Sequence, residues 1–317
     1  MWRLSSEITI GGKRFRAVNG VQIKRSINEL MGTATIRIPV TALLKQKGSP
    51  PTKVQTAQAI AVGDPVLIRL GYDGKLQTEF TGYVKTINLK TPVEIECEDE
   101  FYQCRRRKIT LSGTTTLADV LAKCGLKVAY SETLTLKNFV QKDRSVAFVL
   151  SKLKTDYGLS VFFDLQGRIY ACRPYKVVGD TVKYRLRYNV INDDSLQYQN
   201  RDDVKIEIKA VCFKKDGTKV EATKGDKDGT TKTLYFYDVE NMAELATLAE
   251  RELQRYSYDG YTGQIETFLA PYAAPAMAAD LSDKVYPQRD GCYYIESVET
   301  TFGTGGGRRK VEIGIKI

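Results

Sequence analysis

Apolar and polar residues alternate over much of the first hundred residues of the chain. The segment 33–38 alternates strictly and is followed by Pro39, while two longer alternating runs flank the dipeptide Asp73-Gly74. A period of two, interrupted by an Asp-Gly pair, is typical of antiparallel strands joined by a tight hairpin turn. The pattern predicts a loop at 45–58 and strands at 14–27, 33–38, 66–70, 76–87 and 93–97.

The pattern changes to a helical period between residues 111 and 180. In the segment 143–158, apolar residues recur at spacings of three and four, and Gly158 ends the run. Such spacing predicts a helix with one buried face, and a terminal glycine supplies the left-handed conformation that commonly ends helices. A shorter run of the same kind spans 114–125, and a strand–turn–strand pattern covers 159–172. This segment is predicted to be a small α/β unit.

Alternation returns after residue 180. The whole pattern predicts a mainly β chain with an α+β insertion. Two similar β-barrel domains, at 1–110 and 181–317, are expected to flank a small α/β domain at 111–180. Within the last domain we predict a charged hairpin at 214–232, a helix at about 241–256, and strands at 204–211, 233–239, 261–269, 292–302 and 310–317.

The absence of histidine narrows the possible chemistry. The 317 residues include no histidine, so neither a Ser-His-Asp or Cys-His pairing nor a His-containing metal site can form within the chain. No two cysteines form a Cys-x-x-Cys pair, and we interpret them as reduced, mostly buried thiols. No catalytic, metal or cofactor site is predicted. The six cysteines are Cys97, Cys104, Cys124, Cys172, Cys212 and Cys292.

The positive charge of the chain is uneven. The net charge is +10; residues 1–110 carry 18 basic and 10 acidic side chains, whereas residues 181–317 carry 20 and 22. A basic N-terminal region and a slightly acidic C-terminal region favour directional docking onto charged partners. The run Arg105-Arg106-Arg107-Lys108 follows an acidic strand. We interpret it as a neutralising partner of that strand or as a subunit contact, with a nucleic-acid patch as the alternative.

Carboxylates occupy alternate positions at Glu94, Glu96 and Glu98, and Asp99 and Glu100 extend the charge. Alternate residues of a strand share one face, so the pattern predicts an acidic, solvated strand face. A carboxylate-dependent enzyme would instead need two carboxylates that face each other across a substrate. Glu94 and Asp99 would then be the candidates.

Two loops match ligand-binding motifs only in part. The glycine-rich segment 303–309 precedes a predicted strand, whereas a phosphate loop needs a helix at that point. The segment 226–229, Asp-Lys-Asp-Gly, lacks the third acidic position and the closing glutamate of a calcium loop. Both are predicted to be hairpin turns.

The remaining features of the sequence indicate a component of a protein assembly. It has no apolar run near the ~18 residues of a membrane span and no signal-peptide core near its start, so stable membrane insertion is not expected. It contains 19 tyrosines. Tyrosine is enriched at protein interfaces because it buries area and keeps a polar tip.

Three stretches, taken in order, resemble the central hub protein of phage tail baseplates. This is the late control protein D family, which includes the hub of Mu-like phages and the N-terminal part of the type VI secretion spike. The first stretch is Phe-Thr-Gly-Tyr-Val-Lys-Thr-Ile at 80–87, followed by the strand at 93–99. The second is Ser-Val-Ala-Phe-Val-Leu-Ser-Lys-Leu at 145–153, followed by the hairpin around Gly167. The third is the helix at 243–256, followed by Gly-Cys-Tyr-Tyr-Ile-Glu-Ser-Val at 291–298 and the last strand.

The resemblance implies a virion structural protein that acts as a symmetry adaptor, without catalysis or cofactors. A homotrimer would place two similar barrels per chain in a pseudo-six-fold ring, which joins the three-fold spike to the six-fold tail tube. Because the chain stops at Ile317, the spike is expected to be a separate polypeptide. Further expected partners are the tail tube or its initiator and other baseplate proteins, with no specific nucleic acid. The expected place is the baseplate of the virion tail, assembled in the bacterial host cytoplasm.

The resemblance fits a phage, a prophage or a tail-derived secretion machine, and a contractile or a non-contractile tail. A carboxylate-dependent cell-envelope-degrading enzyme and a basic nucleic-acid-binding protein are the alternative functions.

A ring that meets a six-fold tube with three chains needs two near-equivalent faces per chain. The sequence basis for such a duplication is the pattern Phe80-Thr81-Gly82-Tyr83 in the first strand-rich region and Tyr261-Thr262-Gly263-Gln264 in the second. With a net charge of +8 in residues 1–110 and −2 in residues 181–317, alternating charge is expected around the ring.

Overall fold

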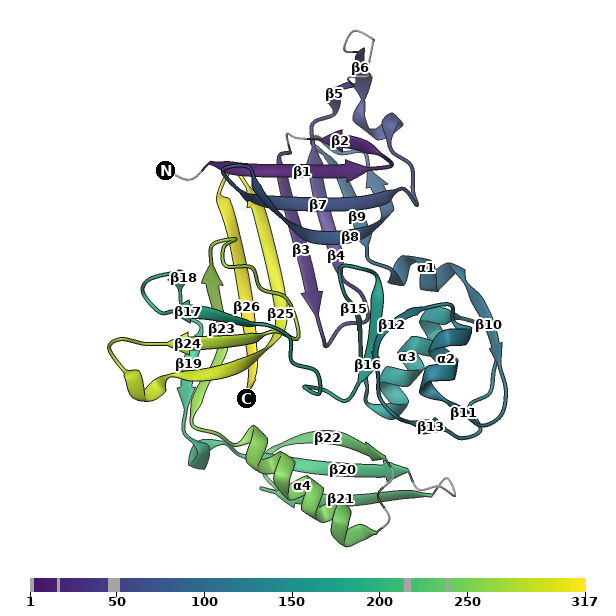
Figure 1. Ribbon diagram of the computed structural model, residues 1–317, viewed down its shortest axis with the longest axis vertical. Helices are drawn as coiled ribbons and strands as arrows, with labels where there is room; N and C mark the ends of the chain where they lie inside the picture. Colours follow the sequence, from purple (N-terminus) through teal and green to yellow (C-terminus); the bar gives the residue numbers. More distant parts are fainter. Residues whose placement is uncertain (1–2, 16–17, 45–51, 214–217, 238, 240) are drawn as a thin grey trace.

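The computed structural model (Figure 1) describes residues 3–15, 18–44, 52–213, 218–237, 239 and 241–317. Strands dominate both ends of the chain, and most helical residues lie in two places: beside the hairpin β15–β16 and along the small sheet β20–β22. The mainly β prediction, with an α+β insertion, is confirmed.

The first hundred residues form strands, as the alternation predicts. Asp73 and Gly74 adopt positive φ angles of 51° and 78°, which is the conformation that a two-residue hairpin turn requires. The strands are β1 (Leu4–Ile10), β2 (Lys13–Phe15), β3 (Gly20–Ser26), β4 (Thr33–Ile38), β5 (Thr41–Leu44), β6 (Thr52–Gln55), β7 (Pro65–Tyr72), β8 (Lys75–Asn88) and β9 (Val93–Glu98).

The loop prediction at 45–58 is partly wrong. Residues 45–51 lie outside the described residues, but β6 pairs with β5, and the 3-10 helix η1 (Thr56–Ala59) follows it. The hairpin β5–β6 projects from the end of the sheet (Figure 1).

The α/β unit is built around two helices. The helix predicted at 143–158 begins only at Val146, because residues 143–145 belong to the strand Gln141–Ser145. Thr116 caps α2 (Leu117–Lys123) by accepting from Asp119 N–H, and Ser145 caps α3 (Val146–Tyr157) by accepting from Phe148 N–H. Gly158 ends α3 in the left-handed conformation, with φ 61°. The remaining elements are α1 (Phe101–Arg106), β10 (Lys108–Leu111), β11 (Thr115–Thr116), β12 (Lys127–Ser131), β13 (Thr135–Leu136), β14 (Gln141–Ser145), β15 (Ser160–Phe163) and β16 (Arg168–Cys172).

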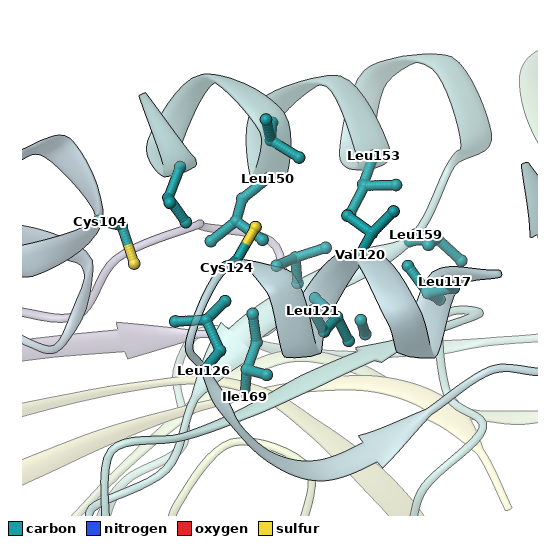
Figure 2. Close-up of a cluster of buried hydrophobic side chains, with 14 of the residues drawn as sticks. Cys104, Leu117, Val120, Leu121, Cys124, Leu126, Leu150, Leu153, Leu159 and Ile169 are labelled. Atoms are coloured by element: carbon teal, nitrogen blue, oxygen red, sulfur yellow. The ribbon is translucent and has the colours of Figure 1, made fainter. Parts of the chain in front are cut away.

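A leucine-rich core holds this unit together. Figure 2 shows side chains of α2 and α3, among them Val120, Leu121, Leu150 and Leu153, gathered between the two helices. All four are fully buried. The apolar spacing of three and four therefore faces the core, as amphipathic periodicity predicts.

After residue 180 the chain alternates between the main sheet and a small α/β module. The module comprises β20 (Ile206–Phe213), β21 (Lys219–Gly225), β22 (Thr230–Tyr237) and α4 (Met242–Tyr256). The other elements are β17 (Thr181–Arg185), β18 (Val190–Asn192), β19 (Leu196–Gln199), η2 (Arg201–Asp203), β23 (Gly260–Thr267), β24 (Ala278–Ser282), η3 (Pro287–Arg289), β25 (Gly291–Gly303) and β26 (Gly306–Lys316).

The charged hairpin predicted at 214–232 is wrong in its pairing. Residues 214–217 lie outside the described residues, and the turn at 226–229 joins β21 to β22 without pairing them. Instead, β22 crosses over and pairs in parallel with β20, on the side away from β21. The physical reason is burial: Ile208 and Ala210 of β20 pack beneath α4 and are fully buried, so β20 takes the central place.

The two strand-rich regions are not separate sheets. One 14-stranded sheet runs through both, in the order β18-β23-β26-β25-β3-β4-β9-β8-β7-β1-β2, with β17, β19 and β24 off this path. The join is the antiparallel pair β3–β25, visible where the purple and yellow strands meet (Figure 1). Among the described residues no closed barrel is present, because each region continues into the other through this pair.

Four hydrophobic clusters lie along the chain. One comes mainly from the first region, one from the α/β unit, one from the small module with parts of its neighbours, and one from the last region. The division into domains at residues 110 and 180 remains a prediction.

Candidate functional site: two equivalent strand units and their open edges

Two groups of six strands share one order of pairing, and we name them unit 1 and unit 2. Unit 1 has the order β3-β4-β9-β8-β7-β1, and unit 2 has the order β19-β23-β26-β25-β24-β17, with β18 continuing the line of β19. When the six strands of each unit are numbered 1 to 6 along the chain, both units have the same spatial order, 2-3-6-5-4-1. This agreement supports an internal duplication.

The agreement extends to the register of the strands. A bulge interrupts the β8–β9 ladder at Lys85 and the β25–β26 ladder at Glu296. Bulges are specific features of a sheet, because each one bends its strand and shifts the pairing by one residue. The pairs on either side also correspond: Val84–Cys97 with Ile295–Ile313, and Thr86–Glu96 with Ser297–Glu312.

The turn that precedes β7 has a counterpart before β24. Gly63 N–H donates to Val84 O at 2.8 Å, and Ala276 N–H donates to Ile295 O at 2.9 Å. Both donors have positive φ, 93° at Gly63 and 68° at Ala276. Positive φ is costly for alanine, so the second turn keeps a conformation that its residue type does not favour.

Two features depart from the simple duplication. β1 pairs antiparallel with β7, whereas β17 pairs parallel with β24. The residues on which the sequence hypothesis rests do not correspond either: Gly82 lies in β8, the counterpart of β25, while Gly263 lies in β23, the counterpart of β4. The shared Thr-Gly pattern is therefore a coincidence, and the equivalence rests on register.

We call the pair β3–β25 the seam, because it joins unit 1 to unit 2 within one chain. Its register runs from Ser297 opposite Ser26 to Gly303 opposite Gly20. Ile23 and Thr300 oppose each other there, and each side chain is 2% exposed. Beside them, Lys24 Nζ lies 3.6 Å from a carboxylate oxygen of Glu299.

A buried ion pair fastens the two units next to the seam. Arg309 Nη2 of β26 lies 2.5 Å from Glu79 Oε1 of β8, and the two side chains are 0% and 4% exposed. Arg309 also donates to the carbonyl oxygens of Leu269 and Pro271, at 2.5 and 2.7 Å. Burial raises the pKa of Glu79, and Arg309 opposes that increase. The sequence held no signal for this pair, because its members are far apart along the chain.

Counterparts of the seam strands exist at the opposite edges of the two units. By rank and register, β8 corresponds to β25, and β19 corresponds to β3. Leu89, the counterpart of buried Thr300, is 81% exposed, and Leu196, the counterpart of buried Ile23, is partly exposed. We call residues 86–89 and 196–199 the open edges.

Glu94 and Asp99 do not form a catalytic pair. Glu94 is the second residue of β9 and Asp99 follows its last residue, so a rise of about 3.3 Å per residue separates them by roughly 16 Å, beyond the ~9.5 Å limit of glycosidase dyads. Glu94 pairs with Arg37 at 3.1 Å and with Lys90 at 3.0 Å, and these partners hold its pKa below the usual range.

Asp99 is buried and accepts from Gly32 N–H at 2.6 Å and from Phe101 N–H at 3.0 Å. Burial raises its pKa to about 7, against the opposing effect of these two bonds. A carboxyl group whose pKa is higher in the folded state binds more protons when folded, so its contribution to stability decreases as the pH rises from about 4 to about 7.

Replacing Asp99 should flatten this pH dependence. Relative to Asp99→Asn, the wild type should lose up to about 1.4 kcal/mol of unfolding free energy per pH unit within that window. Urea unfolding at pH 5 and pH 7 measures the difference, with exposed Asp228→Asn as the control. A difference between wild type and Asp99→Asn that stays constant with pH would contradict the assignment.

The basic run acts mainly within the chain. Arg105 lies 3.2 Å from Glu98, Arg107 lies 3.5 Å from Glu100, and Arg106 stacks on an aromatic ring. The interpretation as a neutralising partner is confirmed. The prediction of a solvated strand face is wrong at Glu98. This residue is 1% exposed, because α1 and Lys85 cover that end of β9.

The cysteines and the glycine-rich loop have the places predicted from the sequence. Five cysteines are buried, Cys292 is partly buried and all six are free, as interpreted from the sequence. The loop at 303–309 is the tip of the hairpin β25–β26, with Gly303 opposite Gly306. The described part of the chain holds no group of three Cys, Asp or Glu residues arranged for a metal ion.

None of the described helices is both long and apolar enough to cross a membrane.

The fold, rather than the sequence, relates this chain to known proteins. No family model matches it, and no curated protein matches it. The tail protein from Neisseria meningitidis MC58 is similar in structure, with a TM-score of 0.61 and 12% identity over 99% of this chain and 96% of that chain. The 43 kDa tail protein of prophage MuSo2 from Shewanella oneidensis has a TM-score of 0.58 and 16% identity, over 98% and 97%.

A third similar structure belongs to a secretion machine. It is the Escherichia coli protein c3393, described as a component of the type VI secretion system with structural similarity to the T4 bacteriophage tail proteins gp27 and gp5. The TM-score is 0.58 and the identity 10%, over 97% of this chain and 74% of that chain. The predicted resemblance is thus confirmed in structure: the chain has the fold of phage tail and type VI secretion spike-related proteins.

Proposed function

We propose that the chain is the structural hub of a phage tail or tail-like injection machine, in which three copies form a pseudo-six-fold ring. The ring would join a central spike to the tail tube. The observation that carries the proposal is the register-level equivalence of unit 1 and unit 2, which gives each chain two similar faces. Three such chains offer six faces, which is what a six-fold tube requires.

The seam supplies a template for the contact between chains. Within one chain, β3 of unit 1 pairs with β25 of unit 2. The equivalent contact between chains pairs β19 of one copy with β8 of the next. Transferring the register gives the opposed pairs Thr86–Gln199, Ile87–Tyr198, Asn88–Gln197 and Leu89–Leu196.

Exposure of the open edges supports this contact. Unpaired strand edges present free N–H and C=O groups that favour pairing with another chain. Leu89 and Leu196 would be buried by the contact, as Thr300 and Ile23 are at the seam. Because one copy offers β8 and the next offers β19, the contact is heterologous and closes only as a ring.

The ring would work through geometry and charge. Residues 1–110, with a net charge of +8, contain unit 1, and residues 181–317, with −2, contain unit 2, so the charge would alternate around the ring and help to set its register. The domain boundaries at 110 and 180 belong to this proposal. So do a separate spike protein, the tail tube and other baseplate proteins as partners, and the virion tail as the location.

Light scattering of the purified protein tests the ring. We expect a mass of about three times 35.6 kDa. Leu89→Lys should shift the mass to one chain because it places a charge in the buried contact, whereas Val178→Lys, an equally charged change at another exposed position, should not. A wild-type monomer at every concentration would contradict the proposal.

A further inference from the structure

A small pocket lies where the α/β unit meets the module of β20–β22 and α4. Its volume is about 260 Å³, and no residue of the seam or of the open edges lines it. Four segments line it: the end of α3, the residues after β16, the strand β22 and the last turns of α4. The lining residues used below are Gly158, Arg173, Tyr175, Lys176, Arg251, Glu252, Arg255 and Tyr256.

The pocket is strongly basic. Four cations line it, against one carboxylate, Glu252. Arg255 Nη1 lies 3.6 Å from Glu252, but Arg251 lies 4.0 Å away and is 67% exposed. Lys176 is exposed and has no ion-pair partner among the described residues. Lys176 and Arg251 are therefore the cations most available to a ligand.

Arg173 also retains hydrogen-bonding capacity. Its Nε atom is buried, lies 3.5 Å from Glu132 Oε1 and makes no hydrogen bond to any described residue. The side chain as a whole is 35% exposed, so a ligand can still reach the outer part of its guanidinium group. Guanidinium groups bind carboxylates with two parallel bonds, so arginine is well suited to this role.

The walls of the pocket are held in place before any ligand arrives. Tyr175 adopts a positive φ of 59°, and its hydroxyl donates to Glu296. Its ring packs against that of Tyr256, with centroids 6.0 Å apart. At Gly158 an added Cβ would lie 2.0 Å from the ring of Tyr235, so the two parts meet closely. Pre-organisation of this kind lowers the entropic cost of binding.

We propose that this pocket binds the carboxylate side chains of an acidic peptide segment from a partner protein. The volume admits one or two side chains, not an extended polymer. The small volume therefore favours a short acidic segment over nucleic acid.

Binding of a fluorescein-labelled hexaglutamate peptide, measured by anisotropy at low ionic strength, tests the proposal. The double variant Lys176→Glu/Arg251→Glu should bind at least tenfold more weakly than the wild type, and both side chains are exposed, so the fold should persist. Lys183→Glu/Arg185→Glu removes the same charge from exposed positions of β17 and should lower the affinity less than threefold.

Two results would overturn the assignment. One is equal loss of affinity in both double variants, which would mean that only net charge attracts the peptide. The other is binding of labelled decathymidylate to the wild type that is as tight as that of hexaglutamate and is lost in Lys176→Glu/Arg251→Glu, which would mean a nucleic-acid site. The trimer mass is measured separately, so neither result affects the proposed ring.

Discussion

Arg309→Ala should destabilise the protein by about 3–5 kcal/mol, because it leaves the carboxylate of Glu79 buried without its partner. Arg309 is fully buried and bonds to Glu79 and to the backbone at Leu269 and Pro271, so all of these acceptors would lose a charged donor at once. Urea unfolding at neutral pH measures the loss.

A double variant separates the ion pair from simple packing. In Glu79→Gln/Arg309→Met the buried charges disappear together, so the cost should be clearly smaller than in Arg309→Ala. Lys24→Ala serves as the control for a charge at the seam, because its ion pair with Glu299 is exposed and should contribute no more than about 1 kcal/mol. A cost below about 1 kcal/mol in Arg309→Ala would show that the pair does not fasten the two units.

Local signals in the sequence predict the local elements well. Gly158 ends α3 because a left-handed stop acts within one turn of the helix. The Asp73-Gly74 hairpin likewise depends only on the turn residues and the strands beside them. Both could be predicted because the physical cause lies within a few residues.

Long-range pairing could not be predicted in the same way. The seam brings Ser26 opposite Ser297, and neither strand carries a local feature that identifies the strand with which it pairs. The crossover of β22 depends on which strand α4 covers, not on the turn that precedes it. The open edges can be identified only when the register of both units is known.

The duplication shows the same limit. Equivalent positions in the two units keep their register but do not always keep their charge, as at the bulge, where Lys85 corresponds to Glu296. Sheet geometry tolerates such exchanges because a bulge depends on backbone conformation. The shared Thr-Gly pattern therefore selected Gly82 and Gly263, which are not equivalent. The equivalent segments are instead 83–87, Tyr-Val-Lys-Thr-Ile, and 294–298, Tyr-Ile-Glu-Ser-Val.

Disulfide formation across the open edges tests the ring most directly. Asn88 and Gln197 are the counterparts of Glu299 and Lys24, which oppose each other at the seam. Opposed residues of antiparallel strands have Cα atoms about 4.5–5.5 Å apart, which suits a disulfide. Lys24→Cys/Glu299→Cys is the matched control and should form a bond within one chain.

After mild oxidation, Asn88→Cys/Gln197→Cys should run on a non-reducing denaturing gel at about three chain masses, and reduction should return it to one. The control should stay at one chain mass in both conditions, and each single variant should remain uncrosslinked. If the control forms its bond while Asn88→Cys/Gln197→Cys stays at one chain mass, the open edges do not meet and the proposed ring is contradicted.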